Sequence, residues 1–322
     1  MSRKVAFVTG VTGQDGSYLA EFLLGKGYEV HGTLKRNSVA ENQTARLDDI
    51  FTQINLHYAD LTDLSSLTRV IQEVKPVEIY NLAAQSHVRI SFDQPIYTAN
   101  VTGLGTLNVL EVARSSGAHV IFSSSSSVYG RNMQLPKDES MWLGPMTPYA
   151  ASKLAAEGYV QAYAAAYGLP TTILRFFNVF GPSQRPDHEY AAVLPKWIWL
   201  AMQGKPIDVY GDGTASRDFT YVDTVLDIAI TAMNEKVLTE GAMNLAYGNR
   251  IFLSDTIEML RKHFPDLKVN YVAERLGDVK ESQNAPDLLK RLFPKVQPKD
   301  FETALTETID WLKEFGQSVA NG

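Results

Sequence analysis

Short apolar runs alternate with amphipathic stretches through the first 175 residues of the chain. Each apolar run is nearly continuous, which is typical of strands that are covered on both faces in a parallel sheet. The stretches between the runs are long enough to be crossover helices. The pattern predicts strands at Val5–Thr9, Val30–Leu34, Ile54–Tyr58, Glu78–Leu82, His119–Ser123 and Thr171–Phe177, and helices at Gln14–Lys26, Asp63–Val74, Thr98–Ser116 and Pro148–Tyr167.

This alternation predicts an α/β fold with a doubly wound parallel sheet, a Rossmann fold, whose ligand crevice lies beyond the carboxyl ends of the strands. From Gly181 the pattern becomes less regular, which indicates a smaller mixed α/β domain. A helix at Val222–Asn234 and a strand at Ala242–Ala246 are expected to return to the first sheet. We therefore predict a dinucleotide-binding domain over residues 1–177, also including about 222–246, and a second domain over residues 178–322.

Composition narrows the classes of function. The 322 residues are 45% hydrophobic and 20% charged, as in ordinary globular proteins, and no apolar run approaches the ~20 residues of a membrane span. The net charge of −6 argues against nucleic-acid or anionic-membrane binding. The absence of cysteine excludes disulfides and thiolate chemistry, and the six histidines are isolated in sequence, so no metal site is expected. Only five apolar residues precede the first glycine, too few for a signal peptide, and we expect a cytoplasmic protein.

The first predicted strand runs directly into a glycine-rich turn, Gly10-Val11-Thr12-Gly13-Gln14-Asp15-Gly16. Gly10 suits the positive φ of a tight turn, Gly13 lets a pyrophosphate approach the backbone, and Gly16 lets helix and strand pack closely. Many β–α turns contain glycine, but the place of this one at the first strand of a βαβ series favours dinucleotide binding.

The segment after the second strand bears on the choice of dinucleotide. An acidic residue there would hold the adenosine ribose and favour NAD, but the segment contains Lys35, Arg36 and Ser38 instead. These side chains suit a 2′-phosphate and favour NADP, although a charged loop is also compatible with plain solvation. Asp60, after the third strand, is suited either to the adenine amine or to a helix cap.

Tyr149 and Lys153 lie one turn apart at the start of a predicted helix, which places the phenol and the ammonium on one face. An ammonium ~4 Å from the phenol supplies about 4 kcal/mol at an effective dielectric of ~20, roughly what lowers a pKa near 10 toward 7. Just before this helix a strand ends in a serine run, Ser123–Ser127. Buried hydroxyls need partners, so serines at the carboxyl end of a strand indicate either ligand contact or a polar turn.

Together these segments resemble the extended short-chain dehydrogenase/reductase family, in particular its nucleotide-sugar epimerases and dehydratases. The resemblance extends over essentially the whole chain. It is carried by Thr9–Leu19 (TGVTGQDGSYL), Tyr80–Val88 (YNLAAQSHV), the set Ser125, Tyr149 and Lys153, and Arg175–Pro182 (RFFNVFGP).

The resemblance implies roles for individual residues. Ser125 would be the active-site hydroxyl, Tyr149 the acid/base, and Lys153 the group that lowers its pKa and holds the nicotinamide ribose. The implied cofactor-binding residues are Gly10, Gly13, Gln14, Asp15, Gly16, Lys35, Arg36, Ser38, Asp60, Leu61, Leu82, Ala83, Ala84, Tyr149 and Lys153, with NADP preferred and NAD possible. The resemblance further implies that residues 178–322 form a nucleotide-sugar-binding domain. For Arg217 and Arg275, a structural salt bridge explains the residue as well as binding of the diphosphate does. The implied residues for the nucleotide sugar are Ser86, Ser126, Asn178, Val193, Lys196, Arg217, Arg275 and Asp278.

The two halves of the chain resemble different relatives. Residues 14–18 and 85–88 are most similar to GDP-mannose 4,6-dehydratases, whereas residues 190–197 and 210–219 resemble UDP-hexose and UDP-N-acetylhexosamine 4-epimerases. The dehydratases usually have a carboxylate just after the active-site hydroxyl, where this chain has Ser126 and Ser127, and a serine is too weak a base to replace it.

We therefore expect a 4-epimerase that oxidises C4 transiently. A GDP-mannose-type 4,6-dehydratase is the first alternative, and an NADPH-dependent 4-ketosugar reductase or a non-enzymatic dinucleotide sensor are further ones. The resemblance implies a homodimer, with helices Thr98–Ser116 and Pro148–Tyr167 paired across a two-fold axis, although apolar faces of these helices are also compatible with burial within one subunit.

Overall fold

Two compact units make up the chain. The computed structural model describes residues 3–36, 44–186, 191–239, 241–274 and 280–321. Unit 1 contains residues 1–133, 139–176 and 226–244, and unit 2 contains residues 134–138, 177–225 and 245–322.

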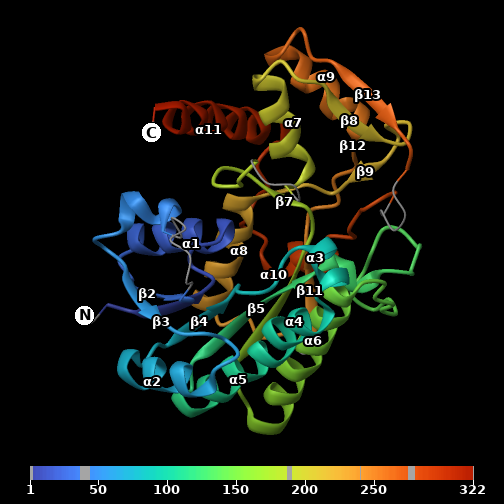
Figure 1. Ribbon diagram of the computed structural model, residues 1–322. Helices are drawn as coiled ribbons and strands as arrows, with labels where there is room; N and C mark the ends of the chain where they lie inside the picture. Colours follow the sequence, from blue (N-terminus) through green and yellow to red (C-terminus); the bar gives the residue numbers. More distant parts are fainter. Residues whose placement is uncertain (1–2, 37–43, 187–190, 240, 275–279, 322) are drawn as a thin grey trace. The chain divides into compact units, whose positions relative to one another are not determined.

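A seven-stranded sheet forms the centre of unit 1 (Figure 1). Its strand order is β11-β6-β5-β4-β1-β2-β3, and the strand pairs from β6 across to β3 are parallel. This arrangement confirms the predicted doubly wound parallel sheet. The strands are β1 (Val5–Thr9), β2 (Glu29–Leu34), β3 (Asn55–Tyr58), β4 (Glu78–Asn81), β5 (His119–Ser125), β6 (Thr171–Phe176) and β11 (Ala242–Leu245).

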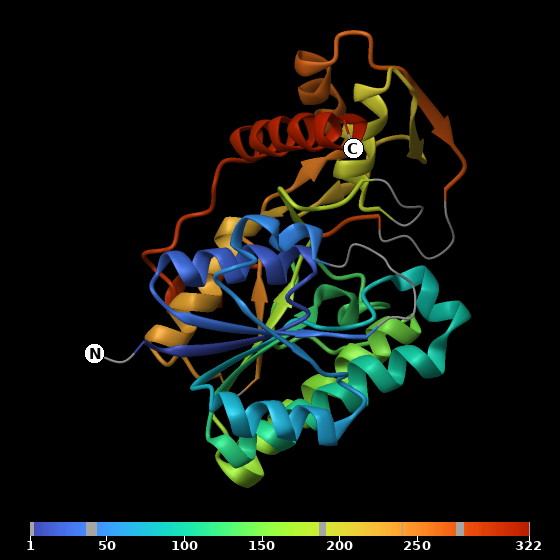
Figure 2. The ribbon, with the colours of Figure 1, turned by 60° about the vertical axis from the view of Figure 1, so that its left-hand side comes forward.

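Helices cover both faces of this sheet, and Figure 2 shows α1 and α8 on one face and α2, α5 and α6 on the other. Apolar side chains between the sheet and the helices α2, α5 and α6 form a core that includes Phe7, Ile79, Leu110, Phe122 and Val160. The helical segments are α1 (Gln14–Gly25), η1 (Ala45–Ile50), α2 (Leu64–Val74), α3 (Val88–Asp93), α4 (Pro95–Thr98), η2 (Ala99–Leu104), α5 (Gly105–Ser116), η3 (Ser126–Tyr129), α6 (Pro148–Tyr167) and α8 (Val222–Asn234), whose first four residues belong to unit 2.

One predicted helix differs from the structure. The segment expected to be a single helix over Thr98–Ser116 is continuous with α4 and contains the π-helix η2 before α5 begins at Gly105. Leu61 packs closely against the first residue of α5, because a Cβ on Gly105 would lie 2.9 Å from Leu61 Cβ. Periodicity predicts a helix here but does not reveal a change from four-residue to five-residue hydrogen bonding.

Unit 2 has its own apolar core, formed by side chains such as Phe180, Trp197, Phe219, Leu260 and Leu305. Three strand pairs, β10-β7, β12-β9 and β13-β8, surround it. None of the helices in the described ranges is both long and apolar enough to cross a membrane. The elements are β7 (Val179–Phe180), α7 (Val193–Met202), β8 (Ile207–Tyr210), β9 (Ser216–Arg217), β10 (Thr220–Tyr221), β12 (Ile251–Phe252), α9 (Leu253–His263), β13 (Val269–Val272), α10 (Asp287–Leu292) and α11 (Phe301–Asn321).

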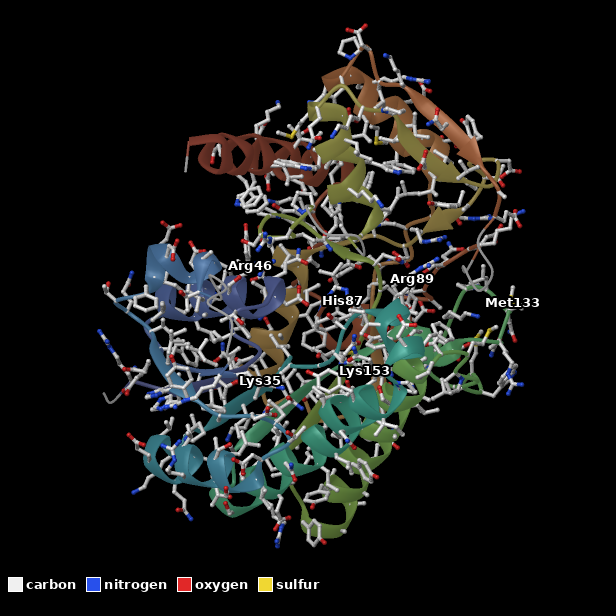
Figure 3. All side chains as sticks on the ribbon, viewed as in Figure 1. Lys35, Arg46, His87, Arg89, Met133 and Lys153 are labelled. Carbon is white, nitrogen blue, oxygen red and sulfur yellow. The ribbon has the colours of Figure 1, made fainter. Side chains whose placement is uncertain are left out.

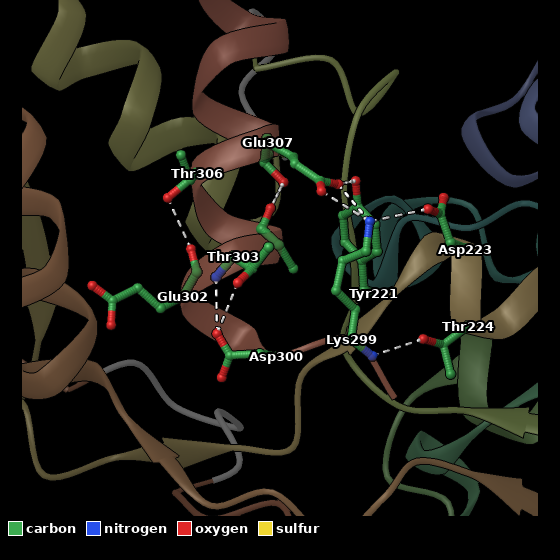
Figure 4. Close-up of polar contacts among 11 residues, drawn as sticks. Tyr221, Asp223, Thr224, Lys299, Asp300, Glu302, Thr303, Thr306 and Glu307 are labelled. Carbon is green, nitrogen blue, oxygen red and sulfur yellow. Dashed lines mark hydrogen bonds and ion pairs between the residues drawn. The ribbon is translucent and has the colours of Figure 1, made fainter. Parts of the chain in front are cut away.

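Polar contacts join the start of α11 to the start of α8 (Figure 4). Lys299 Nζ lies 2.7 Å from Glu307 Oε2 and 3.4 Å from Asp223 Oδ2, and it stacks over the Tyr221 ring. The Tyr221 hydroxyl donates to Glu307 Oε2 at 2.7 Å. Asp300 accepts from the Thr303 backbone N–H at 3.0 Å, so the first turn of α11 is also held.

The turn between β1 and α1 is closed by glycine contacts. Gly10 has φ +69°, and the Gly13 N–H donates to the Gly10 carbonyl at 2.9 Å. A Cβ on Gly16 would lie 2.2 Å from Gly10 O and 2.8 Å from Val11 Cα, closer than real side chains come to backbone. The positive φ and the close helix–strand approach expected from the sequence are therefore both present, and the N-cap Gly13 provides no side-chain cap for the first turn of α1.

Gly16→Ala should destabilise unit 1 because its new methyl group meets backbone atoms that cannot move aside. We expect a loss of about 1–3 kcal/mol in the free energy of unfolding, measured by denaturant titration. Gly25→Ala is the matched control on the same helix, where a Cβ would have no neighbour within 4 Å. It should be neutral or stabilise by roughly 0.5–1 kcal/mol, and equal losses in both variants would contradict the packing argument.

Candidate active site

The three residues expected to carry chemistry lie close together in unit 1. Ser125 is the last residue of β5, and Tyr149 and Lys153 occupy the first two turns of α6. That helix begins after Thr147, whose hydroxyl accepts from the Ala150 N–H at 3.1 Å, with Pro148 at its first position. The cap and the proline fix the residue at which α6 starts, and this start determines where Tyr149 lies along β5.

Tyr149 and Ser125 are joined by a side-chain hydrogen bond. Ser125 Oγ also accepts from the Ser127 backbone N–H at 3.2 Å. Burial raises the pKa of Tyr149, the Ser125 bond lowers it, and the negative charge of Asp15 raises it again. Without the charge of a nicotinamide ring, burial outweighs the Ser125 bond, and the lowering of this pKa by Lys153 together with a bound dinucleotide stays a prediction.

Lys153 is a buried cation, with 3% of its surface exposed. Its Nζ donates to the Ser123 carbonyl at 2.6 Å and lies 5.1 Å from the centre of the Phe122 ring. Figure 3 labels Lys153 among the side chains of the molecule. Burial lowers its pKa to about 8, against the opposing charges of Asp15 and Glu157. Lys153 is therefore charged at neutral pH and loses its charge under mildly alkaline conditions.

Asp15 connects the glycine turn to these residues. It lies in the first turn of α1, and its charge acts on both Tyr149 and Lys153. Its Oδ1 is buried without a hydrogen-bond partner among the described residues, and burial raises the pKa of the carboxyl to about 6. The motif places Asp15 in the turn, but its effect on Lys153 depends on the starts of α1 and α6 meeting at the same edge of the sheet, which no local pattern reveals.

The other expected cofactor residues follow neighbouring strands of the sheet. Lys35 and Arg36 come after β2, Asp60 and Leu61 after β3, and Leu82, Ala83 and Ala84 after β4, while Ser38 lies outside the described residues. Because parallel strands end at the same edge, these positions share the edge that bears Gly10 and Ser125. The Ala83 N–H donates to Thr9 Oγ1 at 3.1 Å, which ties β4 to the glycine turn.

The basic pair after β2 already has partners. Lys35 Nζ lies 3.2 Å from Asp60 Oδ2, and Arg36 stacks over the Tyr58 ring. Asp60 Oδ1 also accepts from the Thr62 N–H at 2.9 Å; burial opposes ionisation, but the bonds from Thr62 and Lys35 hold the pKa of this carboxyl below its ordinary value. Asp60 closes the turn before α2, but the expected helix cap is Asp63, whose side chain accepts from the Ser65 and Ser66 N–H groups; the contact of Asp60 with adenine stays a prediction.

Sequence reasoning missed one cation at the glycine turn. Arg46, in η1, donates from Nη1 to the Thr12 carbonyl at 3.1 Å. Its guanidinium therefore lies beside the turn that binds the phosphates in dinucleotide folds. Arg46 falls 10 residues beyond Arg36, outside any glycine-turn motif, so only the position of η1 identifies it.

The serine run divides between structural and available hydroxyls. Ser123 Oγ donates to the Asn81 carbonyl at 3.2 Å, and Ser124 Oγ donates to Glu157 Oε1 at 2.5 Å. Ser127 Oγ is buried and has no partner within the described chain. The hydroxyls of Ser123 and Ser124 therefore have structural partners. The expected substrate residues Ser86 and Ser126 follow β4 and β5 at the same edge of the sheet.

In unit 2, the expected substrate residues come from three elements. Asn178 precedes β7, and its Nδ2 donates to the Asp218 carbonyl and to Ser282 Oγ, both at 3.2 Å, so this amide is partly used within the unit. Val193 and Lys196 lie in the first turn of α7. Arg217, in β9, donates to the Ser216 and Lys280 carbonyls. Arg275 and Asp278 lie outside the described residues.

The residues present fit a bound dinucleotide. The glycine turn leaves no room for a Cβ at Gly16, and the first turn of α1 has no side-chain cap. Gly10 to Gly16 would hold the diphosphate, Lys35 and Arg36 would face the adenosine end, and Lys153 would face the nicotinamide ribose. Within the described ranges, no three histidine, aspartate or glutamate side chains are grouped so that they could hold a metal ion.

Comparison with known proteins places the whole chain among nucleotide-sugar enzymes. A family model described as GDP-mannose 4,6 dehydratase matches residues 7–308. The chain is 50% identical over 337 aligned residues to GDP-mannose 4,6 dehydratase 2 of Arabidopsis thaliana, an alignment that covers 95% of this chain and 89% of that protein.

Solved structures with the same fold include two sugar epimerases. The UDP-N-acetylglucosamine 4-epimerase of Methanobrevibacter ruminantium, in complex with UDP-N-acetylmuramic acid, has a TM-score of 0.88 and 31% identity, with 98% of this chain and 99% of that chain covered. The UDP-glucuronic acid 4-epimerase of Bacillus cereus, in complex with UDP-glucuronic acid and NAD, has a TM-score of 0.85 and 26% identity, with 97% and 99% covered.

Proposed function

The chain belongs to the GDP-mannose 4,6-dehydratase family, and from this premise we propose that it is an NAD(P)-dependent enzyme that oxidises a nucleotide sugar at C4. The observation that carries the proposal is the hydrogen-bonded pair Ser125 and Tyr149 beside the buried Lys153. A dinucleotide sensor would need the glycine turn but not this pair. Membership in an enzyme family further disfavours a sensor.

In this mechanism Tyr149 removes the proton of the C4 hydroxyl while Ser125 holds that hydroxyl in place. When bound, the oxidised dinucleotide supplies a hydride acceptor and a positive charge. Lys153 adds a second positive charge on the same helix, so that the phenolate form of Tyr149 is favoured despite its burial. Asp15 opposes this effect at Tyr149 but keeps Lys153 protonated.

The relatives favour 4,6-dehydration as the outcome, with GDP-mannose as the substrate class. This is the alternative to the 4-epimerase that we expected from the sequence. Dehydration needs a group that removes the C5 proton and releases the C6 hydroxyl as water. Tyr149 is engaged at C4, so the dehydratase proposal requires a second acid/base next to Ser125.

A 4-epimerase remains the second candidate because of the residues after Ser125. Ser126 and Ser127 occupy the place where a carboxylate is expected in the dehydratases, and a hydroxyl without an activating partner does not remove a carbon-bound proton. Return of the hydride to the opposite face of a rotated 4-keto sugar needs no further base. The two epimerases of the same fold support this route.

We propose NADP as the preferred dinucleotide on the strength of Lys35 and Arg36. Both cations follow β2, where a carboxylate would otherwise bind the ribose hydroxyls of NAD. The Asp60 carboxylate beside Lys35 weakens the case for Lys35 and leaves Arg36, over Tyr58, as the stronger 2′-phosphate ligand. The epimerase of Bacillus cereus was solved with NAD, so the distinction rests on these two residues.

A homodimer also stays a proposal, with α5 and α6 as the paired helices. Leu104, next to α5, is 48% exposed and Tyr167, at the end of α6, is 57% exposed, which leaves apolar surface on these elements. The cytoplasmic location stays a prediction.

Tyr149→Phe should lower turnover about 100- to 10,000-fold, because it removes the proton acceptor without changing the size of the ring. Dinucleotide binding, measured by titration calorimetry, should be little changed. Tyr159→Phe on the same helix is the control and should keep near-normal turnover, since Tyr159 packs in the core of unit 1. Full turnover in Tyr149→Phe would refute the assigned base.

Product analysis separates the possible outcomes. Incubation with GDP-mannose should yield a product lighter by one water for a 4,6-dehydratase, whereas UDP-hexoses should yield isomers of unchanged mass for a 4-epimerase. A 4-ketosugar reductase would consume NADPH in step with product. Mass spectrometry with chromatography of the sugars makes the assignment, and no conversion of either substrate class would contradict the proposal.

Replacing both Lys35 and Arg36 with Ala should weaken NADP binding by roughly tenfold or more, since charge-assisted bonds to a phosphate are worth about 1.5–3 kcal/mol. NAD lacks this phosphate and serves as the internal control. Dissociation constants for both dinucleotides provide the measurement, and equal weakening of the two would remove the preference for NADP.

A further inference from the structure

A buried ion pair lies behind the proposed catalytic residues and has no part in the mechanism above. Glu157 of α6 and Arg175 of β6 are joined by two hydrogen bonds, Nε to Oε1 at 2.9 Å and Nη2 to Oε2 at 2.8 Å. Their side chains are 2% and 4% exposed. Neither residue lies at the cofactor turn or next to Ser125 in the chain.

The pair is connected to the active site through both of its neighbours. Glu157 is one helical turn beyond Lys153 on α6, and it accepts a hydrogen bond from the Ser124 hydroxyl. Ser124 lies in the chain between Ser125 and Ser123, whose carbonyl accepts the hydrogen bond from Lys153. Arg175 donates from Nη1 to the Tyr129 hydroxyl at 2.9 Å.

The outer end of this network is also closed. The Tyr129 hydroxyl donates to Asn244 Oδ1 at 2.8 Å, and the Asn244 N–H donates to Glu139 Oε1 at 2.9 Å. The bonds therefore join α6, β5, β6, β11 and η3 around the end of β5.

Stability alone does not account for such a pair. Taking two charges out of water costs several kcal/mol each, and well-packed apolar side chains of similar volume are often as stable or more so. The pair does, however, place one carboxylate behind the Lys153 ammonium. The buried cations Lys153 and Arg175 are then matched by the anions Asp15 and Glu157.

We propose that Glu157, held in place by Arg175 and Ser124, is a positioning residue that keeps Lys153 protonated and bound to the Ser123 carbonyl. This inference rests on the proposed role of Lys153 in C4 oxidation. The charged groups that bear on Lys153 are Asp15 from α1 and Glu157 from its own helix.

The sign of the effect follows from these charges. Burial lowers the pKa of Lys153, and the carboxylates of Asp15 and Glu157 raise it. Arg175 of β6 acts directly on Glu157, whereas Tyr129 of η3 acts on Arg175, and Glu139, in the loop after η3, acts on Tyr129. Removing the negative charge of Glu157 should therefore let Lys153 lose its proton at lower pH.

The test is Glu157→Gln, which keeps the shape and one acceptor but removes the charge. Trace labelling of the ligand-free protein with acetic anhydride, read by peptide mass spectrometry across pH, should show Lys153 becoming reactive about one pH unit lower than in the parent protein. The alkaline limb of the pH–turnover profile should move by the same amount. Glu258→Gln, which breaks an exposed pair with Arg261 on α9, should change neither curve.

A second variant keeps the test decisive if Glu157→Gln folds poorly. Glu157→Gln with Arg175→Met removes the pair together and leaves no buried charge without a partner. Lys153 then loses the Glu157 carboxylate, which raises its pKa, together with the positive charge of Arg175. Because these two changes partly cancel, the labelling curve should move in the same direction as in Glu157→Gln but by a smaller amount. An unchanged curve in either folded variant, or a shift to higher pH, would overturn the proposal.

The outcome remains distinct from a failure of the proposed function. If Lys153→Met kept full turnover, the assigned chemistry would be wrong, whereas the labelling shift in Glu157→Gln would still establish the positioning contact. If Tyr149→Phe abolished turnover but the labelling curve did not move, the chemistry would stand and the role of Glu157 would be refuted.

Discussion

The arrangement of the candidate active site in unit 1 depends on one requirement, which is that the buried ammonium of Lys153 must be compensated by nearby groups. Lys153 is charged at neutral pH and nearly fully buried, and an isolated buried ammonium is too costly to persist. Its charge is tolerated because a backbone carbonyl accepts it directly and two carboxylates, Asp15 and Glu157, lie near enough to act on it. The glycine turn, the end of β5 and helix α6 must all be in place for these groups to coincide.

The parallel sheet meets that requirement through its strand order. β4 lies between β1 and β5, so the glycine turn and Ser125 end at the same edge with only one strand between them. The bond from Ala83 to Thr9 and that from Ser123 to Asn81 fasten these three strands at that edge. A fold that placed β1 elsewhere would separate Asp15 from Lys153, and the cation would lose half of its compensating charge.

Sequence patterns predicted what depends on neighbouring residues. A continuous apolar run identifies β1, whose predicted bounds agree with the structure at both ends. The helix over Pro148–Tyr167 is identified by local signals, a proline at its first position and a glycine just after its end. The pair of Glu157 and Arg175 could not be found this way, because its partners are 18 residues apart on different elements. The raised pKa of Tyr149 could not be predicted either, because the spacing from Lys153 can be read from the sequence, whereas the burial of the phenol depends on the packed molecule.

The two candidate outcomes of the reaction share this arrangement and diverge after it. In the proposed mechanism, oxidation at C4 uses Ser125, Tyr149 and Lys153, and both dehydration and epimerisation begin with this step. Similarity over nearly the whole chain reports on the scaffold that supports oxidation, while the fate of the 4-keto sugar depends on one additional base. In this chain the place for that base holds Ser126 and Ser127, and the hydroxyl of Ser127 is buried without a partner among the described residues. A hydroxyl without an activating partner does not remove a carbon-bound proton, so the proposed dehydration needs a base from another place in the site, whereas the proposed epimerisation does not.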